Sequence, residues 1–394
     1  MPTPNQLAEA LPSHPGRIFG LDLLRAGAIL ITVFGHAAML VPPAYRSAHN
    51  VAISAIDGVN IFFVLSGYLI GGILLKALLS TDKPFSLGHF WMRRWLRTLP
   101  AYLVVLGGLL LVGAVQHRLP PGVARYLWFG QNLTTPHPDF FPEGWSLAIE
   151  EWFYLLFPLG VLLGAALLPS RRWAFAGTIA LFLVLPPLFK YYQYHQGLGL
   201  ANWDAYYRRV VAARLDAIAL GVLACYLQHY HATAWRWLRG HGPKLAGGLL
   251  LITFLYPKLG PQVLFYNIWL RPLLECLTVL LVLPFLSQLR YPRYTAAMRG
   301  VTLLSSISYS LYLLNKSVLI KLVLLPLNQA VFTPHLGAAG WVVGYLLFWV
   351  LLFGGAWLLY TYVEQPGMRL RDSFDKPRRG ARPPAPVAGL VAAQ

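Results

Sequence analysis

Charge and cysteine are scarce in this chain. Only 12% of its 394 residues are charged, whereas 57% are hydrophobic and the mean hydropathy is +0.55. A soluble domain of this length needs far more polar surface, so the composition predicts an all-α integral membrane protein that crosses the bilayer several times. The two cysteines, Cys225 and Cys276, lie in apolar runs without CxxC or histidine spacing. We expect small core residues there, and neither a disulfide nor a metal site.

Several motifs of soluble catalysis are also missing. The chain has no Walker loop, GxGxxG, GxSxG or HExxH in a suitable context. Nucleotide hydrolysis, dinucleotide redox chemistry and zinc proteolysis therefore have no support in the sequence. The histidines of the loops and span ends show no metal-ligand spacing, so no metal is expected.

Acidic residues are few, with 14 Asp and Glu against 32 Lys and Arg. A formal charge of +18 can indicate nucleic-acid binding, but these basic residues alternate from loop to loop. Most fall on the side of the N-terminus, which by the positive-inside rule predicts about ten spans with both termini cytoplasmic. We interpret the excess charge as an orientation signal with some attraction to anionic membrane lipid, and expect no nucleic-acid partner.

Apolar runs fill most of the chain, and most reach the roughly 20 residues that cross a bilayer. The connections between them leave no room for an added soluble enzyme, so we expect one membrane domain over residues 17–372. Residues 1–16 and 373–394 are rich in Pro, Ala and polar groups and are expected to be flexible tails. The runs are 18–42, 51–78, 99–116, 145–168, 173–194, 209–230, 245–258, 268–289, 303–326 and 338–362.

The first run, RIFGLDLLRAGAILITVFGHAAMLV, carries ionisable side chains. Such groups cost a few kcal/mol each inside a span and normally face the protein interior. Arg25 and His36 are eleven residues apart, almost a whole number of turns, so they share one helix face at a separation of about 16 Å. Asp22 lies on that face three residues before Arg25, where it can neutralise the guanidinium.

A second constellation opens the run at 145–168 with WSLAIEEWFYLLFP. Glu150 and Glu151 follow Trp145 and Ser146 by about one turn. We expect Glu150 and His36 to meet in the outer half of the membrane. The carboxylate would then fix the imidazole tautomer and stabilise the imidazolium, as general-base catalysis requires. The alternative is an interfacial helix start, where acids favour the helix dipole.

Two further segments offer candidate binding groups. The segment DGVNIFFVLSGYLIGG presents Asn60 and Ser66, which can hydrogen-bond a thioester or oxyanion, while its glycines are expected to pack helices closely. The segment GHFWMRRWLRTLPAY carries Arg93, Arg94 and Arg97. Such a cluster matches phosphate groups, and the alternative is anchoring at the cytoplasmic interface.

The segment VVAARLDAIALG places Arg214 and Asp216 in or near the membrane. Residues two apart do not share a helix face, so each is expected to have a partner on another helix. The two remain candidates for a structural ion-pair network or for the lining of a pathway.

Taken in order, these pieces resemble the acyltransferase-3 family of bacterial membrane O-acyltransferases over about residues 17–372. The resemblance implies a ten-span, multi-pass protein of the bacterial cytoplasmic (inner) membrane. It implies transfer of an acyl group, commonly acetyl, from a coenzyme A thioester to a hydroxyl of a glycan, lipid-linked sugar or secondary metabolite. The matching pieces are Arg25 and His36 with ten residues between, GVNIFFVLSGYLI, FWMRRWLRTLPAY, WSLAIEEWFYLLFP, RLDAIALG, SYSLYL and YVEQPGMRLR.

The resemblance also implies site residues. It makes His36 the catalytic histidine, with Arg25, Glu150 and the pair Arg94 and Arg97 at the donor site. Two positions depart from the pattern, because the family usually has an acid at Asn60 and a histidine at Asn315. An acid and a base have both become amides, so we hypothesise that these two positions touch.

The sequence thus predicts an acyltransferase in which His36 deprotonates the acceptor hydroxyl and Glu150 orients His36. The arginine cluster would hold the phosphates of an acyl-CoA, most simply acetyl-CoA, and Arg25 would line the route between the two sites. A transporter or flippase for glycolipids or acylated metabolites is the alternative, although no internal repeat supports it. A non-catalytic partner in a polysaccharide export complex is a weaker one. Candidate substrate contacts are Asp22, Asn60, Ser66, Trp145, Ser146, Arg214 and Asp216.

Overall fold

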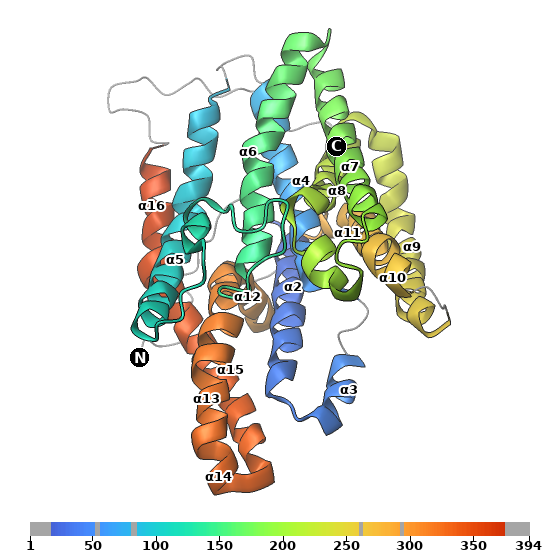
Figure 1. The fold of residues 1–394 in the computed structure, drawn as a ribbon. Coiled ribbons are helices and arrows are strands. Elements are labelled where there is room, and N and C mark those ends of the chain that lie inside the picture. The colour runs from blue at the N-terminus through green and yellow to red at the C-terminus, as the bar shows by residue number, and fades with distance from the viewer. Residues whose placement is uncertain (1–16, 52–55, 80–84, 260–262, 292–294, 375–394) are drawn as a thin grey trace.

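The computed structural model of the chain describes residues 17–51, 56–79, 85–259, 263–291 and 295–374, and within these ranges every regular element is helical. The protein is an all-α membrane protein, as predicted, and each expected apolar run falls on a long helix (Figure 1). The long helices are α2 (Phe19–Ala37), α4 (Gly58–Leu79), α5 (Leu87–Val115), α6 (Gly144–Leu167), α7 (Arg171–His195), α8 (Leu215–Tyr230), α9 (Ala232–Leu259), α11 (Arg271–Leu286), α12 (Ala296–Leu314) and α15 (Gly340–Leu359).

Eight helical stretches of the described residues are long and apolar enough to cross a membrane. The predicted spans outside that group are α8, which has only 16 residues, and α9, whose first half contains WRWLRGHGPK. The count of ten spans, the cytoplasmic termini and the domain bounds 17–372 stay predictions. The predicted tails lie outside the described residues, except for Ser373 and Phe374.

Two helices extend beyond the apolar runs that predicted them. The Ser86 hydroxyl accepts a hydrogen bond from the His89 amide at 3.3 Å, so α5 begins before the arginine cluster and carries it. Beyond α12 the chain stays helical to Leu336 through π-helical turns, the first of which begins at Asn315. Such turns widen the backbone and often lie at functional sites. The short α13 (Leu325–Leu327) and α14 (Thr333–Leu336) project with α15 beyond the rest of the bundle (Figure 1).

The centre of the bundle holds α2, which packs against α4 and α12, while α4 also packs closely on α8. Glycines make the α4–α8 approach possible. A Cβ added at Gly67 would lie 1.9 Å from the carbonyl oxygen of Ile218, and one at Gly221 would lie 2.0 Å from that of Val64. The expectation that glycines of the second run pack helices is thus confirmed. This packing fixes α2, α4 and α12 around the polar residues described next.

Shorter elements complete the fold. They are α3 (Pro43–Val51), α10 (Val263–Phe265) and α16 (Gln365–Ser373), with π-helical turns before α11 and α16 and a short 3-10 helix over Val123–Trp128. The segment between α5 and α6 is packed inward, since Tyr126, Asn132 and Glu143 are each at most 1% exposed. As a result α6 begins inside the protein rather than at its surface.

Candidate active site

Three arginines meet in a cavity of about 120 Å³, here called the arginine cavity. Arg25 reaches it from α2, and Arg94 and Arg97 reach it from α5. Six of the residues singled out from the sequence converge here, although they come from four helices. They are Arg25, Ser66, Arg94, Arg97, Ser146 and Glu150.

Tyr154, one turn beyond Glu150 on α6, organises this cavity. Its hydroxyl donates to Glu150 Oε2 at 3.3 Å and contacts the Ser66 hydroxyl, and its ring lies 5.2 Å from the guanidinium carbon of Arg94. Glu151 turns away and accepts a hydrogen bond from Thr98 at 3.0 Å. One carboxylate therefore faces three guanidinium groups, which leaves the arginine cavity with an excess of positive charge suited to phosphate.

Arg25 is held by the predicted ion pair with Asp22, at 3.9 Å, and by the Ser305 hydroxyl at 3.4 Å. Asp22 itself is 3% exposed and lines neither this cavity nor the next. It accepts hydrogen bonds from Arg17, Ser305 and Tyr291, the last at 2.7 Å. Asp22 therefore acts on the site by fastening α2 to α12 and placing Arg25.

His36 lines a second cavity, of about 300 Å³, here called the histidine cavity. Its Nδ1 lies 2.5 Å from Asn315 Oδ1, at the first π-helical turn after α12. The amide nitrogen of Asn315 is already used, since it donates to the carbonyl oxygens of Leu311 and Tyr312 at 3.2 and 2.6 Å. The amide oxygen must then accept, so the proton of neutral His36 lies on Nδ1 and the lone pair on Nε2.

The expected contact between Glu150 and His36 is not found among the described residues. Glu150 lines the arginine cavity and His36 the histidine cavity, and Asn315 orients the imidazole instead. The physical reason is the buried start of α6, which carries Glu150 deeper than an interfacial helix start would. Val59 and Tyr312 line both cavities, so the two sites are neighbours across a thin wall.

Tyr312 is fixed within that wall. Its hydroxyl lies 2.6 Å from the Ser146 hydroxyl and donates to the Glu143 carbonyl oxygen at 3.2 Å. The carboxylate of Glu143 in turn accepts from the backbone amides of Lys316 and Ser317 at 2.8 and 2.7 Å. The start of α6 is thereby tied to the turn that carries Asn315.

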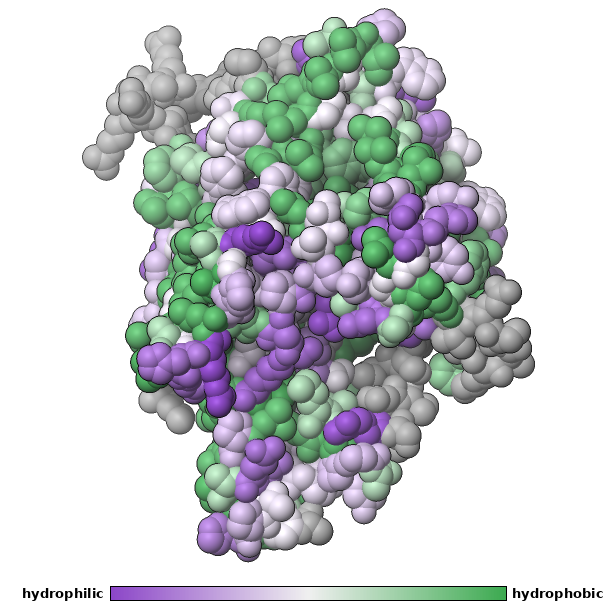
Figure 2. Space-filling model, viewed as in Figure 1, coloured by the Kyte–Doolittle hydropathy of each residue, from purple (hydrophilic) through white to green (hydrophobic). Residues whose placement is uncertain are grey.

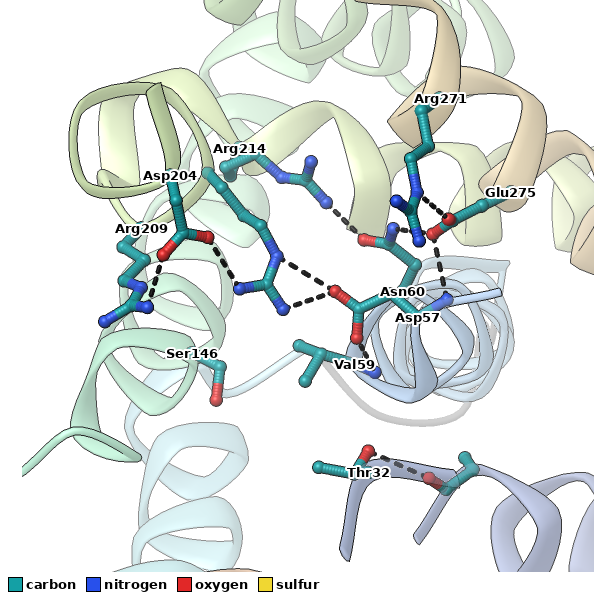
Figure 3. A network of polar contacts seen from close by, with 12 residues as sticks. Thr32, Asp57, Val59, Asn60, Ser146, Asp204, Arg209, Arg214, Arg271 and Glu275 are labelled. Atoms are coloured by element: carbon teal, nitrogen blue, oxygen red, sulfur yellow. Dashed lines mark hydrogen bonds and ion pairs between the residues drawn. The ribbon is translucent and has the colours of Figure 1, made fainter. Parts of the chain in front are cut away.

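Asn60 bridges two charges in the histidine cavity (Figure 3). Its amide oxygen accepts from Arg214, and its amide nitrogen donates to Glu275 Oε2 at 2.6 Å. Both ends of the amide are therefore used within the protein, which argues against the expected contact with a thioester. No hydrogen bond joins Asn60 to Asn315 within the described residues, so the hypothesis that the two amides touch has no support from their bonding.

The remaining candidates are placed as follows. Trp145 lines the histidine cavity with the guanidinium carbon of Arg208 4.8 Å from its ring centre. Asp216 forms an ion pair with Lys190 of α7 at 3.1 Å and lines neither cavity, while Arg214 pairs with Asn60. The expectation that Arg214 and Asp216 have partners on different helices is confirmed. Arg93 lines neither cavity.

Several residues of the histidine cavity were not singled out from the sequence. Asp57 pairs with Arg208, and Glu275 with Arg271 at 2.8 Å. Burial alone raises the pKa of the Asp57 carboxyl, but the charge and hydrogen bonds of Arg208 outweigh it and hold that pKa below its usual value. Asp57 is the first residue of the segment that presents Asn60, and Arg271 precedes a proline. Neither position marks a site residue by itself, and only the pairing of these side chains in space identifies them. The described residues contain no group of three or more His, Cys, Asp or Glu that could hold a metal.

Known proteins share sequence similarity with this chain. The chain is 33% identical over 174 residues to the "Putative peptidoglycan O-acetyltransferase YrhL" of Bacillus subtilis, a match that covers 40% of this chain and 26% of that protein. It is 31% identical over 161 residues to the "Peptidoglycan O-acetyltransferase OatA" of Listeria monocytogenes, covering 36% and 24%. The matches thus span about a quarter of the length of these curated relatives. No solved structure matches the chain.

A family described as "Acyltransferase domain" matches residues 18–361. That range includes both cavities and every residue that lines them. The chain therefore belongs to the acyltransferase-3 family.

Proposed function

We propose that this protein is a multi-pass O-acyltransferase of the bacterial inner membrane. It moves an acyl group, most simply acetyl, from a coenzyme A thioester to a hydroxyl of a carbohydrate or carbohydrate-like metabolite. The observation that carries the proposal is the contact between His36 Nδ1 and Asn315 Oδ1, which leaves the Nε2 lone pair as the only proton acceptor of the ring. A base of this kind beside an arginine-lined cavity suits transfer from an anionic donor.

The donor is assigned to the arginine cavity. Arg94 and Arg97 would bind its phosphates, and Arg25 would contact the arm that leads toward the wall of Val59 and Tyr312. A volume of about 120 Å³ is below that of most ligand sites, so it would hold only part of the donor rather than the whole molecule. Ser66 and Ser146 line the same cavity, but their hydroxyl protons are used within the protein, because Tyr154 and Tyr312 donate their own protons to Glu150 and to the Glu143 carbonyl oxygen.

The chemistry follows from the base and the donor. Nε2 of His36 takes the proton of the acceptor hydroxyl as its oxygen attacks the thioester carbonyl, and a C–O bond forms. The C–S bond then breaks, and the thiolate of coenzyme A takes the proton from the imidazolium. Asn315 holds the ring throughout, because the Nδ1 proton never leaves. Relatives named as peptidoglycan O-acetyltransferases make a cell-wall glycan a reasonable acceptor class.

Acetyl-CoA turnover by the purified full chain in lipid nanodiscs tests this proposal. We expect thiol release that depends on added acceptor and falls to a small residual rate in His36→Gln, whose amide preserves the size but not the basicity of the ring. His335→Gln is the matched control, because His335 lies exposed on α14. A fully active His36→Gln would refute the base, and absence of thiol release by the parent protein would favour a transporter.

A further inference from the structure

The charges of the histidine cavity do not balance in pairs. Five cationic and four carboxylate side chains line it. Three arginines have carboxylate partners: Arg208 contacts Asp57 and Asp204, Arg209 contacts Asp204, and Arg271 contacts Glu275. Figure 3 shows this network around the start of α4. On the face of the molecule drawn in Figure 2, hydrophilic side chains gather across the middle.

The fourth carboxylate, Glu143, forms its hydrogen bonds with the turn that follows Asn315. Besides the two backbone amides already described, it accepts a hydrogen bond from the Ser317 hydroxyl. It is 1% exposed, so it has little surface left for a further partner. Glu143 therefore stabilises the turn after Asn315, and it forms no ion pair with a cation of the cavity among the described residues.

Two cations remain without a carboxylate partner among the described residues. The side chain of Lys316 forms no ion pair or hydrogen bond there, although the residue lines the cavity and is half-buried. Arg214 is 2% exposed, contacts the neutral amide of Asn60, and leaves its buried Nε without an acceptor. Leaving a buried cation unpaired is costly, so both groups are prepared for an anion that enters the cavity.

The position of Lys316 relates that anion to the chemistry. Lys316 directly follows Asn315, whose side chain holds His36. Lys316 and His36 also line the same cavity, so an acceptor whose anionic group binds the ammonium would lie in the cavity that the imidazole faces. A volume of about 300 Å³ is at the small end of ligand sites, which fits one sugar unit rather than a long segment of polymer.

We propose that the histidine cavity selects acceptors that carry an anionic group, a carboxylate or a phosphate, next to the hydroxyl that is acylated. Lys316 is the ligand of that group, and Arg214 adds a second positive charge to the same cavity. The proposal rests on the acyltransferase function and names the acceptor class of the same site.

Binding to the purified full chain in nanodiscs tests it, with three matched probes that lack a free 6-hydroxyl. They are methyl 6-deoxyglucoside, methyl glucuronide and methyl glucoside 6-phosphate. Charge-assisted hydrogen bonds predict at least about 10-fold tighter binding of a charged probe than of the neutral one. If the glucuronide binds more tightly than the 6-phosphate, the anionic group of the acceptor is a carboxylate. If the 6-phosphate binds more tightly, that group is a phosphate.

Variants locate the effect. Lys316→Met should bring the charged and neutral probes to within about twofold of each other, whereas Lys316→Arg should keep the preference. Lys321→Met is the matched control, because Lys321 lies in the same π-helical segment but pairs with Asp139 at 2.6 Å. If Lys316→Met does not fold, the preference of the parent protein should still fall as salt is raised.

Equal binding of the three probes, or no binding of either charged probe, would overturn the proposal. The measurement is repeated in His36→Gln, which lacks the proposed base but keeps Lys316 and Arg214. Charged-probe binding in that variant, alongside a parent protein that releases no thiol from acetyl-CoA, would refute the enzymatic function while leaving the anion site intact. Thiol release by a parent protein that binds the charged and neutral probes equally would support the enzymatic function and refute the anion site.

Discussion

Replacement of Asn315 by leucine should slow acyl transfer without weakening binding of the donor. The substitution keeps the size of the side chain but removes the oxygen that accepts from His36 Nδ1 at 2.5 Å. A buried donor left without its partner costs about 1–3 kcal/mol, and the ring is then free to place its proton on the wrong nitrogen. If that cost appears in the transition state, kcat falls by about 5- to 150-fold. The Michaelis constant for acetyl-CoA should stay the same, because the arginine cavity is untouched.

A double-mutant cycle separates this positioning role from a general loss of structure. Asn315 acts through His36, so Asn315→Leu should cause no further loss of rate when added to His36→Gln. Thermal unfolding of the same variants in nanodiscs measures the structural part, which includes the hydrogen bonds that Asn315 donates to Leu311 and Tyr312. Equal kcat for the parent and Asn315→Leu would refute the assignment of the tautomer. Additive losses in the double variant would show that Asn315 acts independently of His36.

Three further predictions concern other parts of the molecule. Arg94→Gln and Arg97→Gln should raise the Michaelis constant for acetyl-CoA, more strongly at low than at high salt. The control Arg172→Gln, whose guanidinium lies over Tyr230, should leave that constant unchanged. If the Arg94 and Arg97 variants show the same Michaelis constant as the parent at every salt concentration, the two arginines serve as membrane anchors instead. Gly67→Ala should reduce the yield of folded protein, because its Cβ would meet the Ile218 carbonyl at 1.9 Å, while Gly72→Ala, with nothing nearer than 3.8 Å, should be tolerated. The pKa of Asp57 is lower in the folded protein than its value of 3.8 in an unfolded chain. The pairing of Asp57 with Arg208 therefore stabilises the folded protein at pH values above 3.8, and this stabilisation is lost as the pH falls through the lower pKa of the folded state. Acid unfolding should therefore depend less on pH in Asp57→Asn, and an unchanged profile would contradict the pairing.

Much of the site was predictable because the spacing of residues in a helix determines which of its faces each side chain lies on. The separation of eleven positions between Arg25 and His36 places both on one face of α2, and each lines a cavity. The arginines of α5 and the separate partners of Arg214 and Asp216 follow from the same periodicity. Helical spacing alone therefore identified which side chains point inward.

The depth at which a side chain of one helix lies relative to side chains of its neighbours was less predictable. The position of Glu150 was judged on the premise that α6 begins at the membrane surface, whereas its first six residues are buried. Side-chain packing before α6, including Tyr126 and Asn132, sets that depth and has no periodic signature. The ion pairs of the histidine cavity escaped notice for a related reason, since Asp57 and Arg208 are 151 residues apart in the chain.

The wall shared by the two cavities has a consequence for the membrane itself. If donor and acceptor approach from opposite faces, the side chains of Val59 and Tyr312 are what separates two aqueous compartments that differ in ion content and voltage. An acyl group is small and uncharged, so it can cross this wall toward the acceptor, while one proton per turnover passes the other way from the imidazolium to the coenzyme A thiolate. The hydrogen bonds that anchor Tyr312 would then limit the exchange to these two groups and keep coenzyme A on its own side of the wall.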